Sequence, residues 1–67
     1  MTDDPGGEII IEMYQVGNAV KVSAVDIATL VEVSIVGSPS QGEELLKRAA
    51  INKLNYVLRK RREAEKS

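Results

Sequence analysis

The stretch that decides the fold is VEVSIVGSPSQGEELL, residues 31–46. Up to Gly37 its apolar residues recur at every second position, which is typical of a strand with one buried face. Beyond Ser40 the apolar residues recur every three to four positions, from Leu46 to Leu58, which is typical of a helix with one buried stripe. The change of period predicts strands followed by one helix, and by itself it says nothing about function.

Two more strands are predicted before this stretch. The first covers residues 8–16 and is followed by a two-residue turn that starts with Gly17, the residue type that a type II′ hairpin prefers at its first central position. This turn pairs Met13 with Val22 on the buried face, and the alternation of apolar residues selects that register. The next link, over residues 26–30, contains no Gly or Pro and can be drawn with two or four loop residues.

The helix is predicted to begin between Ser38 and Ser40. Ser40 with Glu43 fits a capping box, and Ser38 followed by Pro39 is an equally good start. The predicted length is about 20 to 25 residues, with acidic side chains in the first turn and basic ones in the last. The residues expected in the buried stripe are Leu46, Ala50, Leu54 and Val57 at its centre, Leu58 and Ile51 on one flank, and Leu45 and Ala49 on the other.

The sequence therefore predicts an α+β fold with the order β-β-β-α, in which a three-stranded antiparallel meander is followed by one C-terminal helix packed on one face. At 67 residues there is room for a single domain, and a domain of this size buries only about 60% of its unfolded surface. We expect a disordered leader over residues 1–7, one folded domain over residues 8–62 and a frayed tail over residues 63–67.

The composition excludes several kinds of chemistry. With no Cys and no His, the chain offers no disulfide, thiol nucleophile, histidine base or usual zinc ligand. Paired carboxylates are the remaining catalytic type, and Glu12 and Glu32 would lie open to water with Lys21 between them, which suits neither for acid–base catalysis. We expect no enzyme activity, no cofactor, no metal site and no small-molecule substrate.

The same composition bears on the compartment. Small secreted domains commonly need disulfides, so the absence of Cys points to a reducing environment. The chain starts with Asp3, Asp4 and Glu8 where a signal peptide would need basic residues, and no apolar run approaches the roughly 20 residues of a membrane span. We expect a cytoplasmic protein that does not bind membranes.

A helix that covers one face of the sheet leaves the other face exposed. Lys21 is expected to lie diagonally from Glu12 and Glu32 on this face and to form a charge cluster with them. The face is either solvated with scattered apolar residues or, together with an edge strand, a surface that meets another protein or a second copy of the chain. We predict protein–protein interaction or self-association, with a homodimer as one outcome. The candidate interface residues are Ile10, Tyr14, Val25 and Val36.

Charge is distributed unevenly along the chain. The strand half is acidic and the helix half is basic, with a run of four cations over residues 59–62. On a helix these side chains point about 100° apart, so they cannot all contact one phosphate backbone and act instead as a local positive potential. Weak nucleic-acid binding is the alternative function. Its candidate residues are Lys53, Arg59, Lys60, Arg61 and Arg62.

Three stretches carry a resemblance to a known family: Val20–Asp26, Glu32–Gly37 and Leu54–Arg61. Over residues 7–61 the chain resembles a small family of bacterial single-domain proteins of unknown function, which implies a similar single domain without an established activity. Members tend to carry Gly where this chain has Leu30, and Gly there suits a bulged second turn. Some similar sequences carry the label serine hydroxymethyltransferase, but three short strands under one helix cannot enclose pyridoxal phosphate.

Overall fold

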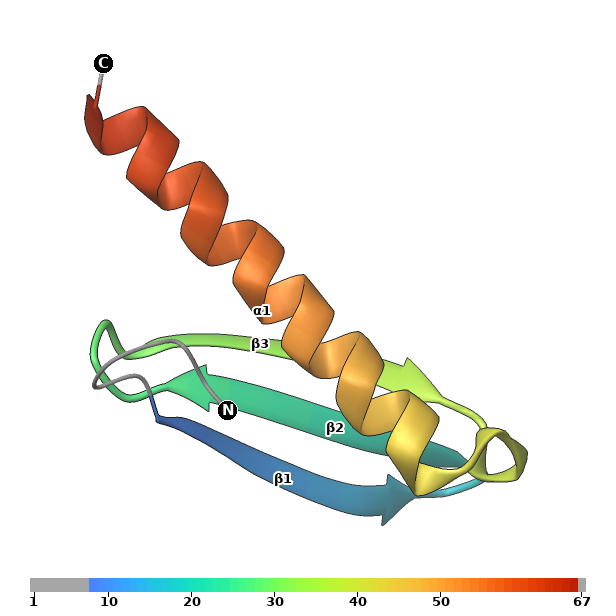
Figure 1. Cartoon of the computed structure of the whole chain (residues 1–67). Coiled ribbons are helices and arrows are strands. Elements are labelled where there is room, and N and C mark those ends of the chain that lie inside the picture. Colours follow the sequence, from blue (N-terminus) through green and yellow to red (C-terminus); the bar gives the residue numbers. More distant parts are fainter. Residues whose placement is uncertain (1–7, 67) are drawn as a thin grey trace.

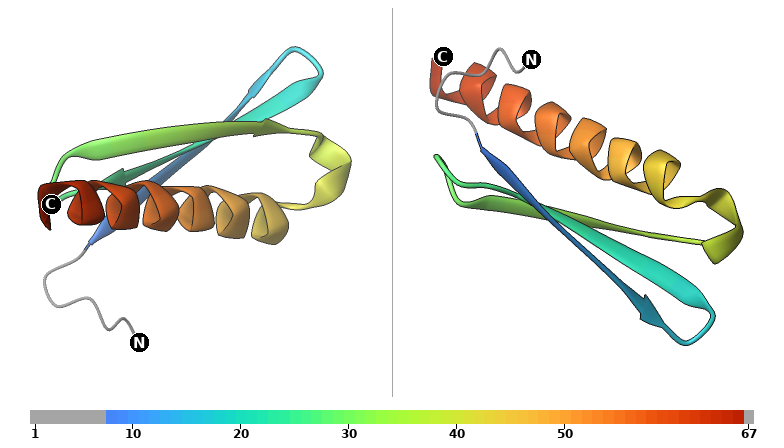
Figure 2. Two further views of the ribbon diagram at one scale, coloured as in Figure 1. Left: turned by 90° about the horizontal axis from the view of Figure 1, so that it is seen from above. Right: turned by 60° about the horizontal axis from the view of Figure 1, so that its bottom comes forward.

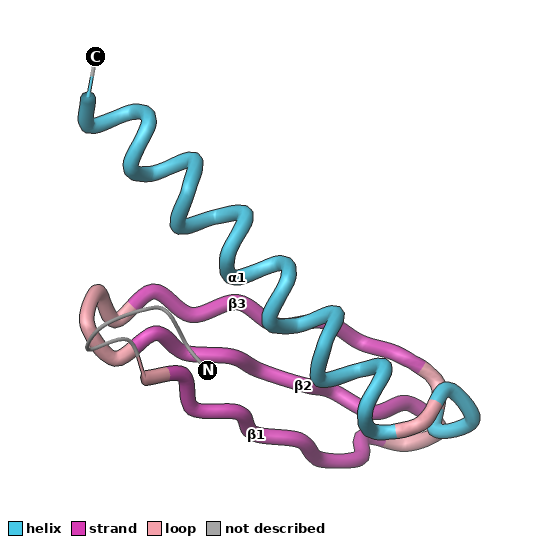
Figure 3. Tube along the Cα trace, in the orientation of Figure 1, coloured by secondary structure: helices cyan, strands magenta, loops and turns pink. Residues whose placement is uncertain are grey.

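The computed structural model describes residues 8–66 and has the predicted α+β architecture (Figure 1). The elements in chain order are β1 (Ile9–Val16), β2 (Ala19–Asp26), β3 (Val31–Gly37), the short 3-10 helix η1 (Pro39–Gln41) and α1 (Glu43–Lys66). The strands form one antiparallel sheet in the order β1-β2-β3, with short loops between neighbouring strands (Figure 3). The sheet is one layer, and α1 forms a second layer on one of its faces (Figure 2).

The first hairpin has the predicted register, with Met13 paired to Val22. Its loop consists of Gly17 and Asn18. Gly17 has φ +62°, whereas Asn18 does not have a positive φ, which is the sign pattern of a type II′ turn. Because side chains alternate along a strand, this register turns the odd-numbered residues of β1 toward the helix side of the sheet.

The second hairpin uses the longer of the two predicted loops, residues 27–30, and β2 and β3 pair without a bulge. Asp26 organises this loop. Its Oδ2 accepts hydrogen bonds from the N–H of Thr29 (3.0 Å) and from the Thr29 hydroxyl (2.7 Å), and its carbonyl accepts one from the N–H of Leu30 (2.7 Å). Leu30 has φ +63°, a left-handed conformation that Gly adopts far more readily. The backbone position that suits Gly therefore exists here, and Leu occupies it.

The link to the helix contains a separate turn. Ser38 caps η1, because its Oγ accepts a hydrogen bond from the N–H of Ser40 (3.2 Å) and its own N–H donates to the Gln41 side chain (2.7 Å). Ser40, the other predicted cap, lies inside η1. Gly42, with φ +89°, then separates η1 from α1, so that the α-helix begins at Glu43.

Gly37 sets how closely the start of the helix approaches β3. A Cβ atom placed on Gly37 would collide with the Leu46 side chain and with Oε1 of Gln41. Leu46 is the first buried residue of α1. The change of period marks Gly37 in the sequence, and the structure shows that this position has no room for a side chain.

The core lies between α1 and the strands β2 and β3. Leu58 and Ile51 flank it and are half-buried, as predicted. The prediction for the other flank is wrong, because Leu45 is 51% exposed and Ala49 is also exposed. On that side Lys53 passes over the outer edge of β3, beyond which there is no sheet to cover the flank. The buried apolar residues are Val22, Ala24, Val33, Leu46, Ala50 and Leu54.

The predicted domain boundaries can be compared with the structure only over residues 8–66. The leader predicted over residues 1–7 lies outside the described residues. Residues 63–66 of the predicted tail form the last turn of α1, and their fraying stays a prediction. Within residues 8–66 the structure contains no helix that is long and apolar enough to span a membrane.

Candidate protein interface

The sheet face that points away from α1, here called the open face, is built from cross-strand rows. The four predicted interface residues lie on this face in two groups. Ile10 neighbours Val25, whereas Tyr14 and Val36 lie on either side of Lys21. Ile10 and Tyr14 are each 48% exposed and Val36 is 68% exposed, while Val25 is half-buried. The rows, read from β1 to β3, are Ile10-Val25-Glu32, Glu12-Ser23-Ser34 and Tyr14-Lys21-Val36, followed by Val16-Ala19 at the hairpin end.

A polar row separates the two apolar groups. Its central residue, Ser23, is only 3% exposed, because the larger side chains of the neighbouring rows flank its small hydroxyl. Glu12 and Ser34 complete the row on the outer strands. The open face is therefore apolar toward both ends and polar across the middle.

Lys21 does not form the predicted charge cluster. Its Nζ lies 6.0 Å from the centroid of the Tyr14 ring, which is a cation–π distance. Glu12 is its diagonal neighbour, as predicted, but Glu32 lies two rows away. Within residues 8–66 no ion pair joins Lys21 to either carboxylate. The cluster fails because Tyr14 shares the row of Lys21 and offers its ring to the ammonium group.

The two carboxylates considered for catalysis do not converge. Glu12 lies on β1 and Glu32 on β3, with β2 between them, and both side chains are exposed. In the described part of the chain no group of three or more His, Cys, Asp or Glu side chains is arranged to hold a metal ion.

Among residues 8–66 no strand pairs with the outer edge of β1. The N–H of Ile27 donates to the carbonyl of Glu8 (3.0 Å), and because antiparallel pairs alternate, this bond identifies the even-numbered residues of β1 as those bonded to β2. β1 contains no Lys, Pro or bulge, the features that usually protect an edge, and Glu12 is its one charged residue. The backbone groups of four residues point outward: Ile9, Ile11, Met13 and Gln15.

The outer edge of β3 is different. The Nζ of Lys53, on α1, donates to the backbone carbonyl of Ser34 (3.0 Å). A lysine at an edge carbonyl discourages another strand from pairing there. Since α1 packs against β2 and β3, the helix protects one edge of the sheet and leaves the other accessible.

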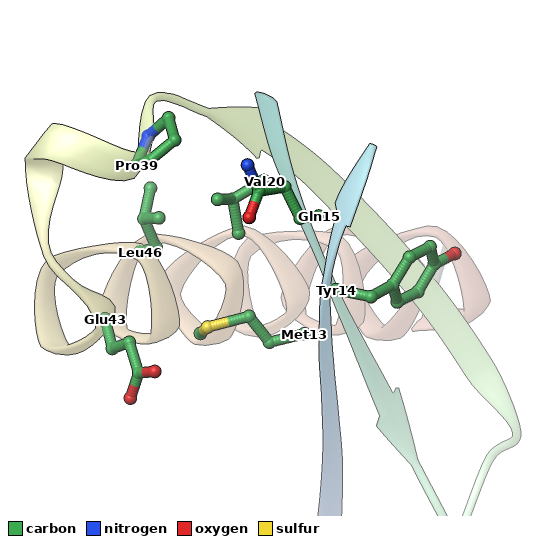
Figure 4. Close-up of a pocket in the computed structure, with 7 residues that line it drawn as sticks. All are labelled: Met13, Tyr14, Gln15, Val20, Pro39, Glu43 and Leu46. Atoms are coloured by element: carbon green, nitrogen blue, oxygen red, sulfur yellow. The ribbon is translucent and has the colours of Figure 1, made fainter. Parts of the chain in front are cut away.

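A hollow of about 300 Å³ lies on the helix side of the sheet, where the first turn of α1 comes near β1 (Figure 4). Met13 points into the hollow from β1, whereas the Tyr14 ring extends from the opposite side of the strand (Figure 4). The hollow shows where the cover of α1 over the sheet ends. Its other lining residues are Gln15, Val20, Pro39, Glu43 and Leu46.

Residues 6–62 match the family model described as a domain of unknown function, DUF6898. The chain belongs to the DUF6898 family. No curated protein and no solved structure matches it. Membership of DUF6898 confirms the resemblance to a small family of unknown function, and it assigns no activity to the surfaces described above.

The predicted nucleic-acid residues of this DUF6898 chain all lie on α1. Lys53 donates a hydrogen bond to β3, and residues 59–62 lie in the exposed last turns of α1, where the helix has risen away from the sheet (Figure 1). The Arg59 guanidinium carbon is 5.9 Å from the centroid of the Tyr56 ring, and Nζ of Lys60 is 4.0 Å from Oε1 of Glu63. Binding of nucleic acid by these residues stays a prediction.

Sequence reasoning missed two parts of the DUF6898 surface. Val16 is 55% exposed on the open face, next to Tyr14 in β1, and the alternation along that strand could have revealed it. The choice of β1 over β3 as the accessible edge was also missed, because it depends on the contact between Lys53 and Ser34. No local sequence pattern predicts that contact.

Proposed function

We propose that this DUF6898 domain is a non-catalytic protein-interaction module that binds through its open face and the free edge of β1. The observation that carries the proposal is the uneven cover of the sheet, in which α1 packs on β2 and β3 while no described strand pairs with the outer edge of β1. Ile10, Tyr14 and Val36 are exposed on the face beside that edge. Grouped apolar side chains next to an unpaired strand are typical of surfaces that bind other proteins.

The small core supports the same proposal. Of the buried apolar residues in the described part of the chain, two are the alanines Ala24 and Ala50, so the core is thin. Domains of this size are marginally stable on their own, and an interface would bury additional apolar surface. We place this activity in the bacterial cytoplasm, where a chain without cysteines needs no oxidising environment.

Two matched substitutions of exposed tyrosines test the proposal. Tyr14→Glu adds a charge to the open face, and Tyr56→Glu adds the same charge to the outer side of α1, where Tyr56 is 54% exposed. Both variants and the unsubstituted chain are compared by sedimentation over a range of concentrations and by capture of proteins from a cell extract, after thermal melts confirm that they fold. We expect association that Tyr14→Glu abolishes and Tyr56→Glu preserves. Absence of any association, or equal loss in both variants, would contradict the proposal.

Nucleic-acid binding by the helix end is tested in parallel, because the run at residues 59–62 is exposed. RNA and DNA are titrated at low salt, where binding through phosphate contacts is strongest. We expect no binding by the unsubstituted chain. Binding that the double substitution Arg61→Glu, Arg62→Glu removes and that Tyr14→Glu leaves intact would favour the alternative function.

A further inference from the structure

We propose that the partner is a second copy of this chain, which adds its own β1 antiparallel to β1 and so forms one six-stranded sheet. This inference rests on the proposed function, because it names the occupant of the same edge. The strand order becomes β3-β2-β1-β1-β2-β3, with a two-fold axis perpendicular to the sheet and both helices on the same face. Each protected β3 edge then lies at an outer end of the assembly.

The free backbone groups limit how two copies of β1 can pair. Only the odd-numbered residues of β1 direct their backbone N–H and C=O groups toward the free edge, so they must pair with odd-numbered residues of the second copy. Two registers pair most of the strand. In the register centred on Glu12, Glu12 faces Glu12 of the second copy, and in the register centred on Met13, Met13 faces Met13 of the second copy. The register centred on Glu12 places the two Glu12 carboxylates directly opposite each other, which is unfavourable.

The register centred on Met13 brings opposite charges together. It places Glu12 of the second copy directly across from Tyr14, over whose ring the Lys21 ammonium group already lies. Lys21 thus extends from β2 toward the edge at which that carboxylate arrives. The two-fold axis repeats this arrangement, so two Glu12 and Lys21 contacts form between the copies. This self-complementary charge pattern argues for a second copy and against an unrelated strand.

The same register also pairs apolar side chains on both faces. On the open face it sets Ile10, 48% exposed, opposite Val16, 55% exposed. On the helix side it sets Ile11 of the second copy opposite Gln15, beside the hollow that Met13 lines. The added strand would therefore cover exposed apolar surface on both sides of β1.

A charge-exchange experiment tests this register. Glu12→Lys and Lys21→Glu each replace two attractive contacts by two repulsive ones, and we expect each variant alone to dimerise about ten-fold more weakly than the unsubstituted chain, as measured by sedimentation. In an equimolar mixture of E12K and K21E, opposite charges meet again at both places, so the heterodimer is expected to regain the original affinity. Glu32→Lys, on the open face but on β3, is the matched control and is expected to leave dimerisation unchanged.

Hydrogen exchange separates edge pairing from stacking of two open faces. In the proposed dimer the outward N–H groups of Ile11, Met13 and Gln15 become hydrogen-bonded, so their exchange slows as the protein concentration rises. A dimer that shows no such protection, or in which mixing the two variants restores nothing, would overturn the inference. A chain that stays monomeric while Tyr14→Glu still abolishes capture of another protein would overturn the inference and leave the proposed function standing. No association of any kind would refute both.

Discussion

Replacing Leu30 by Gly is expected to stabilise the domain, because Leu30 closes the second hairpin with φ +63°. A residue with a Cβ atom pays about 1–2 kcal/mol to adopt the left-handed conformation, since the Cβ approaches the following carbonyl oxygen. Among the residues that the structure describes, Leu30 is the one non-glycine with a positive φ. Its N–H donates to the Asp26 carbonyl (2.7 Å), so the conformation belongs to a hydrogen-bonded turn.

The size of the effect follows from three terms. Gly at position 30 removes the strain of about 1–2 kcal/mol. The greater freedom of Gly in the unfolded chain lowers the resulting gain in the free energy of unfolding by about 0.5–1 kcal/mol. The Leu30 side chain is 75% exposed, so its removal sacrifices little buried surface. The net gain is about 0–1.5 kcal/mol, and its midpoint of about 0.75 kcal/mol raises Tm by roughly 3–6 °C for a domain of this size.

The assay compares Leu30→Gly with Leu30→Ala by urea and thermal unfolding at one protein concentration. The alanine variant removes nearly the same side chain but retains the Cβ atom, so the difference between the two variants reports the backbone strain less the cost of the greater freedom of Gly in the unfolded chain. Holding the concentration fixed is necessary because self-association would make Tm depend on it. If the glycine variant proves no more stable than the alanine variant, the assignment of strain to this turn is refuted.

Three further substitutions probe the packing of the fold. Gly37→Ala is expected to lower the free energy of unfolding by about 1–3 kcal/mol in urea titrations, because the new methyl group collides with Leu46. Leu54→Ala removes a fully buried side chain and is expected to cost about 2–5 kcal/mol, so that far-ultraviolet circular dichroism shows a largely unfolded chain at 37 °C. Asp26→Ala removes the acceptor of both Thr29 hydrogen bonds and is expected to cost about 1–3 kcal/mol and to speed amide exchange at Thr29; unchanged exchange there would show that Asp26 does not hold the loop.

The features that repeat along the sequence were predictable before the structure was known. Over residues 9–13 of β1 and 20–24 of β2 every second residue is apolar, and a slip of one residue would bury Lys21, so the register of the first hairpin had a single good solution. The helix start was harder, because Ser38 and Ser40 are both good caps by their local sequence. Neither caps α1, because the chain turns at Gly42 between η1 and α1 and the α-helix begins only at Glu43.

The candidate site was predictable as a face and not as a set of contacts. Alternation placed Ile10 and Tyr14 on the open face correctly, because the side to which a strand residue points depends only on register. The partner of Lys21 depends instead on which side chain shares its row, and its ammonium group lies over the Tyr14 ring where carboxylates were expected. The exposed flank of the helix was mispredicted for a related reason: the helical wheel gives the direction of Leu45 and does not say over which strands the helix lies.

The uncovered position of β1 follows from the dimensions of the elements and the order of the chain. Neighbouring strands lie about 4.8 Å apart and an α-helix with its side chains is about 10–12 Å wide, so one helix covers two strands of a sheet and leaves a third outside. A short link over residues 38–42 joins β3 to α1, and the helix packs against β3 and its neighbour β2. The strand farthest from β3 in the sheet is β1, the first in the chain. A β-β-β-α chain with so short a link therefore covers its first strand least, and in this chain that strand carries Ile10, Tyr14 and Val16 exposed on one face.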